Sequence, residues 1–233
     1  MNGKALHRWD LPPQEAAKVQ SQLRERLELR WDGREVEFVG GVDIGLRGEM
    51  ALAAIVILSY PELEPIEAVT AQVPVLMPYI SGFLAFREGP AVLSAWERVR
   101  RKPDLLLFDG QGIAHPRGVG IASQMGLWLE TPSIGVAKSR LYGVHDEPGP
   151  GRGERAVLKD SSQAGKAIGM VLRTRERVKP VYVSPGHLID LERAVDFTMR
   201  CTTKYRLPEP TRWADKVAGG AKLPKPDGQA RLF

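Results

Sequence analysis

The chain is poor in the residues that form disulfides or bind zinc. It has one cysteine, Cys201, among 233 residues, which excludes an internal disulfide framework and fits a reducing compartment. Neither an HExxH motif nor a CxxC pair is present, so the sequence gives no indication of a zinc site. The four histidines are scattered along the chain: His7, His115, His145 and His187.

Signature motifs of other enzyme classes are also absent. The sequence has no GxSxG nucleophile elbow and no GxxxxGK[ST] phosphate loop. The stretch Gly110-Gln111-Gly112 lacks the third glycine of a dinucleotide fingerprint. The first ten residues lack the apolar core of a signal peptide, and no uncharged run is long enough to cross a bilayer. We expect a soluble cytoplasmic protein with no membrane partner.

The net charge and the length of the chain narrow the expected partner and domain organisation. Lysine and arginine outnumber aspartate and glutamate by 33 to 28, a formal net charge of +5, which modestly favours a polyanionic partner. No linker divides the middle of the chain, so we expect one domain over residues 1–233 and a monomer, with a loose tail over about 219–233.

The pattern of apolar residues predicts a mixed α/β sheet flanked by helices. After a helix over residues 14–30, three strands separated by short turns occupy residues 35–73 and must run antiparallel. A helix follows Pro78 and leads to the apolar run at 105–108, a crossover long enough to make that strand parallel to an earlier one.

The second half of the chain continues this alternation. We expect helices at 118–129 and 188–200, strands at 132–138, 165–173 and 180–184, and a surface loop at 143–162, which is rich in glycine, proline and charge. Three antiparallel strands followed by helices and parallel strands is the order of a ribonuclease-H-like sheet. Fold order alone fixes no function.

The most informative stretch is LLLFDGQGIAHPRGVG at residues 105–120. It is an apolar strand that ends in Asp109 and a glycine-rich turn, and ligands of open α/β sheets bind beyond such strand ends. Asp43 lies inside another apolar strand, FVGGVDIGL, where a carboxylate needs compensation. If the two strands are neighbours, the two acids repel unless a cation lies between them, and Mg²⁺ suits oxygen ligands and phosphate.

Three further residues are candidates for the same site, each with an ordinary alternative. Glu88 is a third acid, or a glutamate favoured by a helix start. Lys138 closes a strand and can neutralise phosphate or orient water, or it is a solvated lysine. His115 can donate to a phosphate or support the site, or it is a hydrogen-bonded loop histidine. Asp109 itself has the alternative of starting an Asp-Gly turn.

Together these residues carry a resemblance. The segments GVDIG, MPYISGFLAFREGP, LLLFDGQGIAHPRGVGIAS, SIGVAKSRLYG, VSPGH and YRLPEPTRWAD resemble, in the same order, those of endonuclease V, the deoxyinosine 3′ endonuclease family. The resemblance extends over about residues 38–216. It implies a ribonuclease-H-like fold and DNA repair by hydrolysis of the second phosphodiester bond 3′ to deoxyinosine, which leaves 3′-hydroxyl and 5′-phosphate ends.

The resemblance also assigns roles by position. It implies Mg²⁺, or Mn²⁺ in its place, bound by Asp43 and Asp109, with Glu88 and Asp215 as further acids that act directly or through water. Lys138 would assist near the attacking water, and His115 would support the site. The partner would be DNA that contains deoxyinosine, and inosine-containing RNA stays open as a second substrate.

In similar proteins the deaminated base turns out of the stack into a pocket lined by backbone groups. The matching positions here are Tyr79, Ile80, Gly82, Leu84, Gly110, Gly112 and Ile121. Tyr79 belongs to a wedge that the family usually writes Pro-Tyr-Ile-Pro, whereas this chain has Ser81 in place of the second proline. The substitution restores an N–H and frees the backbone at that corner.

Two other functions remain in competition. A resolvase or ribonuclease H type of nuclease would share the metal-binding acids and cleave without regard to inosine. A non-catalytic nucleic-acid-binding domain would use the basic surface alone and leaves the carboxylate of Asp43 within an apolar strand unexplained.

Overall fold

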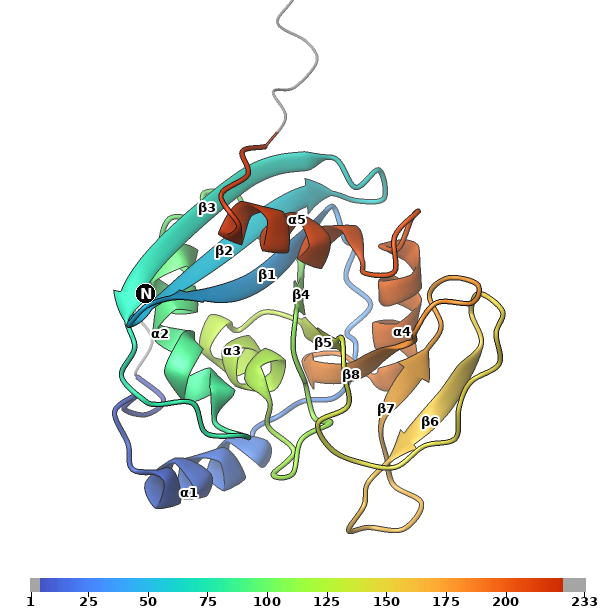
Figure 1. Ribbon diagram of the computed structural model, residues 1–233, viewed down its shortest axis with the longest axis horizontal. Coiled ribbons are helices and arrows are strands. Elements are labelled where there is room, and N and C mark those ends of the chain that lie inside the picture. Colours follow the sequence, from blue (N-terminus) through green and yellow to red (C-terminus); the bar gives the residue numbers. More distant parts are fainter. Residues whose placement is uncertain (1–4, 224–233) are drawn as a thin grey trace, which may run out of the picture.

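The computed structural model describes residues 5–223, and its centre is one eight-stranded sheet in the order β3-β2-β1-β4-β5-β8-β7-β6 (Figure 1). The strands are β1 (Phe38–Arg47), β2 (Met50–Ser59), β3 (Pro65–Pro74), β4 (Leu105–Phe108), β5 (Ser133–Ala137), β6 (Arg155–Lys159), β7 (Ala167–Leu172) and β8 (Val181–His187). The helices are α1 (Pro13–Arg24), α2 (Leu84–Trp96), α3 (Ile121–Leu129), α4 (Leu191–Arg200) and α5 (Glu209–Ala218).

The first half of the sheet confirms the predicted order of strands. β1, β2 and β3 are antiparallel neighbours joined by short turns. β4 then pairs with β1 in parallel, with Val42 opposite Phe108, and β5 pairs with β4 in parallel. The carboxyl ends of β4 and β5 therefore lie at one edge of the sheet, beside the middle of the long strand β1. Residues that leave the sheet there can converge on a common site.

The second half of the sheet corrects one prediction. β8 and β7 are antiparallel to their neighbours, and residues 155–159, predicted as part of a surface loop, form the edge strand β6. Leu158 alone is buried in this five-residue strand, so the hydrophobic signal is weak, and the glycines and prolines before it conceal it. The bridge between Val144 and Lys159 ties the preceding chain to the strand.

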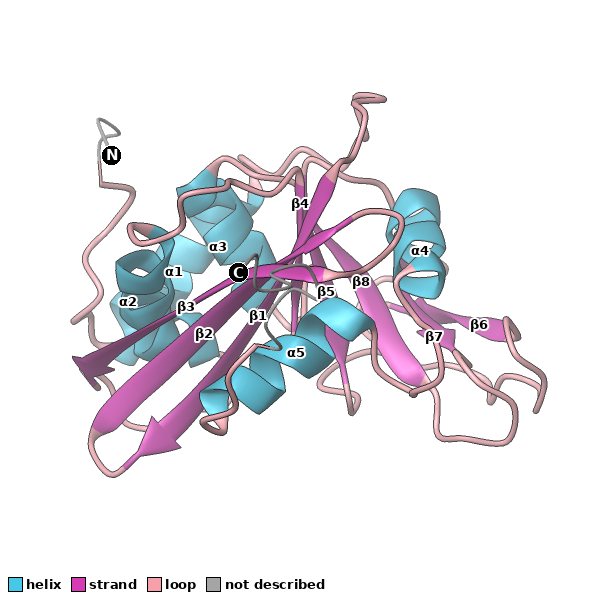
Figure 2. Cartoon of the chain, turned by 90° about the horizontal axis from the view of Figure 1, so that it is seen from above, coloured by secondary structure: helices cyan, strands magenta, loops and turns pink. Residues whose placement is uncertain are grey.

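Both faces of the central strands are covered, which explains their continuous apolar sequences. On one face, Leu105 and Leu107 of β4 join the core cluster under α4 and α5. On the other face, Leu106 and Phe108 join the cluster under α2 and α3. Figure 2 shows α5 on one side of the sheet and α2 and α3 on the other. Because the strands alternate between two cores, a polar residue among them stands out.

The chain before β1 corrects a second prediction. The helix expected over residues 14–30 ends at Arg24, and the following chain is extended. Leu27, Leu29 and Trp31 are partly buried while the residues between them are exposed, which is the period of an extended chain rather than a helix. The N–H of Leu188 donates to the carbonyl of Glu28 at 2.6 Å, so this segment is tied to the end of β8.

The remaining elements agree closely with the sequence. α3 and α4 begin three residues later than predicted, at Ile121 and Leu191. α5, which the sequence pattern did not predict, ends at Ala218; of the tail expected after it, residues 224–233 lie outside the described part of the chain. Within residues 5–223, the helices are all too short or too polar to cross a membrane.

Candidate active site

Three aspartates converge at the carboxyl edge of the sheet. Asp43 lies within β1, Asp109 directly follows β4, and Asp215 lies on α5, with one carboxylate oxygen of each within 4.8 Å of the others. The N–H of Asp109 donates to the carbonyl of Val42 at 3.1 Å, so the parallel pairing of β1 with β4 places the first two acids side by side. The local topology therefore supports the expected meeting of Asp43 and Asp109.

A glycine in β1 allows the third acid to reach them. A Cβ on Gly41 would lie 1.9 Å from the carbonyl oxygen of Pro210, so α5 packs directly on the backbone of β1. No side chain larger than hydrogen fits this approach. The glycine at position 41 thus has a structural reason, which is to let the helix of Asp215 pack against the strand of Asp43.

Burial makes the acidic cluster electrostatically strained. Burial, followed by the charge of Asp109, raises the pKa of Asp43 to about 6. Glu88 projects from α2 with 8% of its surface exposed. Burial, with smaller effects from Asp43 and Asp109, raises its pKa to about 8. The site therefore combines two poorly solvated carboxyl groups, Asp43 and Glu88, with the partly buried Asp109 and the exposed Asp215. A cation would stabilise the charged forms of the buried pair.

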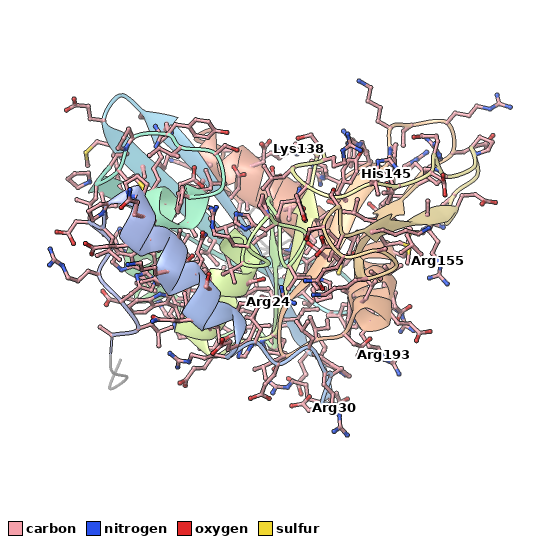
Figure 3. The ribbon with its side chains drawn as sticks, turned by 90° about the horizontal axis from the view of Figure 1, so that it is seen from below. Arg24, Arg30, Lys138, His145, Arg155 and Arg193 are labelled. Carbon is pink, nitrogen blue, oxygen red and sulfur yellow. The ribbon has the colours of Figure 1, made fainter. Side chains whose placement is uncertain are left out.

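Lys138, labelled in Figure 3, places an ammonium group beside this cluster. Its Nζ lies 2.5 Å from Oδ2 of Asp109 and 3.6 Å from Oδ1 of Asp215. Burial alone would lower the pKa of Lys138, but the hydrogen bond to Asp109 and the surrounding carboxylates raise it on balance. One ammonium cannot neutralise three aspartates. The remaining negative charge and the all-oxygen donors fit Mg²⁺ or Mn²⁺.

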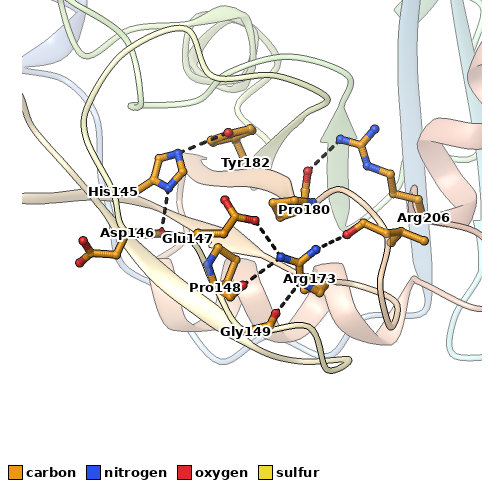
Figure 4. A network of polar contacts seen from close by, with 10 residues as sticks. His145, Asp146, Glu147, Pro148, Gly149, Arg173, Pro180, Tyr182 and Arg206 are labelled. Atoms are coloured by element: carbon orange, nitrogen blue, oxygen red, sulfur yellow. Dashed lines mark hydrogen bonds and ion pairs between the residues drawn. The ribbon is translucent and has the colours of Figure 1, made fainter.

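Two arginines hold the chain that follows Lys138, and Figure 4 shows Arg206 at Pro180 and Arg173 among residues 147–149. Arg206 donates to the carbonyls of Lys138 and Pro180, both at 2.8 Å. Arg173 is nearly buried and donates to Glu147 at 2.8 Å and to the carbonyl of Pro148 at 2.9 Å. These contacts with backbone carbonyls and with the carboxylate of Glu147 therefore anchor the chain that follows Lys138.

A mostly apolar pocket lies between the start of α2 and the start of α3. Five of the seven residues proposed for base binding line it: Tyr79, Ile80, Gly82, Leu84 and Ile121. The other two do not. The N–H of Gly112 donates to Ser184 at 2.8 Å, and Gly110 is packed against Ile121. Gln111, between those two glycines, lines the pocket instead.

The wedge residues form a tight turn at the mouth of the pocket. The N–H of Phe83 donates to the carbonyl of Ile80 at 3.0 Å, and Gly82 has φ +82°. A left-handed glycine at the third position is the arrangement of a type II turn, in which the second position, here Ser81, commonly carries proline. Tyr79 is 67% exposed, and the guanidinium of Arg87 lies 5.7 Å from its ring centre.

His115 contacts the pocket rather than the acidic cluster. Its Nδ1 accepts from the N–H of Arg117 at 3.2 Å, so Nε2 carries the proton and donates to the carbonyl of Gly82 at 3.0 Å. Burial and the charge of Arg117 lower the pKa of His115 to about 4. The imidazole is therefore neutral at pH 7 and fixes the wall of the pocket.

Besides Gln111, sequence reasoning missed a second polar residue of the pocket. Gln20 lies on α1, is 1% exposed, and lines the pocket beside the wedge turn. A glutamine in an amphipathic helix has no local motif that distinguishes it from a surface residue. Its burial in an otherwise apolar helix face is visible only in the folded chain.

Comparison with known proteins agrees with this geometry. An Endonuclease V from Rippkaea orientalis is 50% identical over 207 residues, 88% of this chain and 89% of the relative. The crystal structure of the Endonuclease V from Streptomyces avermitilis matches with a TM-score of 0.85 at 39% identity, covering 91% of this chain and 93% of that one.

A third similar structure contains nucleic acid. The Endonuclease V of Ciona intestinalis, in complex with a 24mer DNA containing an inosine followed by a ribo-adenosine, matches with a TM-score of 0.75 at 30% identity and covers 89% of this chain and 96% of that chain. The family model described as Endonuclease V matches residues 20–216, a range that includes the three aspartates, the lysine and the pocket. The chain therefore belongs to the Endonuclease V family.

Proposed function

We propose that this endodeoxyribonuclease recognises deoxyinosine in DNA and hydrolyses the second phosphodiester bond 3′ to it, leaving 3′-hydroxyl and 5′-phosphate ends, as a step of DNA repair. The observation that carries the proposal is the acidic cluster of Asp43, Asp109 and Asp215 in the same fold as an apolar pocket. A nuclease indifferent to inosine needs the acids and has no need of the pocket.

The donor set supports a divalent cation, with Mg²⁺ as the cofactor and Mn²⁺ able to replace it. Asp43 and Asp109 would hold it, and Glu88 and Asp215 would contribute directly or through water. Such an ion, when bound, lowers the pKa of water and polarises phosphoryl oxygens. The carboxyl groups supply oxygen ligands, and the buried setting of Asp43 and Glu88 makes their negative charge available only where a cation compensates it.

Lys138 contributes positive charge to the reacting phosphate. Its ammonium group donates to Asp109 and lies close to Asp215, so its position is fixed relative to the acids. A fixed ammonium stabilises negative charge that develops on phosphoryl oxygens without having to reorganise during the reaction. It can also orient a water molecule by a hydrogen bond. Lys138 therefore assists hydrolysis beside the acids.

The pocket separates base recognition from the chemistry. A base turned out of the strand would enter between Gly82 and Ile121, with Tyr79 at the mouth to fill the vacated stack. His115 supports this wall through the carbonyl of Gly82. Hypoxanthine carries an oxygen at position 6 where adenine carries an amino group, so backbone groups can distinguish the two by their hydrogen-bonding pattern.

The test is cleavage of matched oligonucleotides. One strand contains a single deoxyinosine, and its control has deoxyadenosine at that position; each is incubated with Mg²⁺ or with EDTA. We expect one cut at the second phosphodiester 3′ to deoxyinosine, only with the metal ion. Equal cleavage of the two strands would favour a nuclease governed by strand structure, and cleavage in EDTA would contradict the role of the acids.

A further inference from the structure

Gln20 occupies the acceptor groups on two walls of the base pocket. Its Nε2 donates to the carbonyl of Gly82 at 3.1 Å and to the carbonyl of Val119 at 3.2 Å. Its Oε1 accepts from Nε of Arg117. Because arginine only donates, the oxygen of the amide must face Arg117 and the amino group must face the carbonyls. Gln20, Gly82 and Val119 all line the pocket.

The carbonyl of Gly82 receives more donors than it has lone pairs. Besides Gln20, it accepts from Nε2 of His115 at 3.0 Å and from the guanidinium of Arg117 at 2.7 Å. A carbonyl oxygen has two lone pairs, so three donors leave no free acceptor position for a ligand. Gly82 has φ +82°, a conformation that favours glycine, and a Cβ there would lie 2.7 Å from that guanidinium.

These contacts have a consequence for the base that enters. Adenine presents an amino group at position 6, which needs an acceptor, whereas hypoxanthine presents an oxygen, which needs a donor. The carbonyls of Gly82 and Val119 are already bonded, so these two walls offer the adenine amino group no acceptor, and an amino group that faces them is desolvated without a partner. Discrimination by an unpaired polar group is a general route to specificity.

We propose that Gln20 is a specificity-determining positioning residue, which occupies the carbonyl of Val119 and shares that of Gly82, so that these walls offer no acceptor to the 6-amino group of adenine. The inference rests on the proposed function, because it assigns a role within deoxyinosine recognition. It connects α1, otherwise a helix that covers the fold, to the selectivity of the site. Gln20 acts through backbone groups and has no part in hydrolysis.

The experiment measures binding in EDTA, where strands stay intact, to three oligonucleotides that differ in one base: hypoxanthine, adenine or unsubstituted purine, which has only hydrogen at position 6. Gln20→Met keeps the length of the side chain and removes both donors. Gln20→Glu removes the donors and retains an acceptor for Arg117. Gln22→Met, at an exposed position of the same helix, is the matched control.

Wild type should bind the hypoxanthine strand more tightly than the adenine strand. Both Gln20 variants should improve binding of adenine relative to purine by about fivefold, the value of one released hydrogen-bond acceptor. That acceptor is the carbonyl of Val119, because the carbonyl of Gly82 keeps His115 and Arg117 as donors. Gln22→Met should not change this ratio. An unchanged ratio of adenine to purine, or an equal loss of affinity for all three strands, would overturn the inference. A wild-type protein without preference for hypoxanthine would instead contradict the proposed function itself.

Discussion

The acidic edge and the base pocket differ in what they are made of. At the edge, the side chains to which we assign the chemistry are charged and lie within or just after strands and on two helices: Asp43, Asp109, Asp215, Glu88 and Lys138. In the pocket, apolar side chains and backbone groups are arranged by neutral or internally satisfied polar residues. The buried acids of the first region need a cation to compensate their charge, whereas in the second the carbonyls of Gly82 and Val119 already accept hydrogen bonds. Chemistry and recognition should therefore respond to different substitutions.

The largest effect should come from the acids. Asp43→Asn and Asp109→Asn each remove a charged oxygen ligand while keeping side-chain size. Losing several kcal/mol of transition-state charge stabilisation should reduce cleavage of a deoxyinosine strand by about 1,000-fold or more. Single-turnover rates with saturating Mg²⁺ measure this, with the exposed Asp146→Asn as control. Near wild-type cleavage by either variant would remove that acid from the metal-binding set.

The pH dependence of stability should report the strain at the same edge. Burial raises the pKa of Glu88 from 4.5 to about 8. Between these values the folded protein keeps a proton that the unfolded chain has released, so stability is fully present below pH 4.5 and falls as the pH rises through 8. The loss in EDTA should be on the order of 4 kcal/mol.

Denaturant unfolding in EDTA at pH 5 and pH 9 measures this loss. Glu88→Gln should make the profile less steep, leaving the smaller loss due to the raised pKa of Asp43, whereas Glu97→Gln, exposed just after α2, should leave it unchanged. Mg²⁺ should restore stability at the higher pH in wild type, because ligand binding to the folded state adds to its stability. A Glu88→Gln profile as steep as that of wild type would show that the buried carboxyl is not responsible.

Those two predictions concern the acidic edge, most of whose residues could be predicted from the sequence. Asp43 in an apolar strand, the crossover to β4 and the glycine-rich turn after Asp109 are local signals, and the parallel pairing converts them into a meeting of two acids. Asp215 and Gln20 differ, because each reaches its place through a helix whose docking depends on remote packing. Gly41 illustrates this, since its reason for being glycine is Pro210, far along the chain. β6 was hidden because edge strands bury few side chains.

A smaller effect should come from the mouth of the pocket. If Tyr79 fills the gap left by a turned-out base, Tyr79→Ala should lose about 1–3 kcal/mol of stacking, roughly five- to a hundredfold in single-turnover rate. The loss should be larger on duplex than on single strands, because only a duplex re-pairs the base. Tyr79→Phe, which keeps the ring, should retain activity. Equal losses on both substrates would contradict the wedge role.

The smallest effect should come from the turn at residues 80–83, which follows Tyr79. Ser81 stands before the left-handed Gly82 in a turn whose second position favours proline. Ser81→Pro should stabilise the protein by about 0.4–1 kcal/mol, because it restricts the unfolded chain, and Ser81→Ala should not. Thermal unfolding at constant pH measures the difference. A lower melting temperature for Ser81→Pro would mean that the turn does not accept a proline.

The separation of chemistry from recognition is tested most directly by the binding preference of Asp109→Asn. Its affinity for single strands containing hypoxanthine or adenine is measured in EDTA beside that of wild type. The account predicts that this variant keeps the wild-type ratio of the two affinities while it fails to cleave either strand when Mg²⁺ is added. A variant that loses its preference for hypoxanthine along with its activity would show that the acidic edge takes part in recognition and would contradict the account.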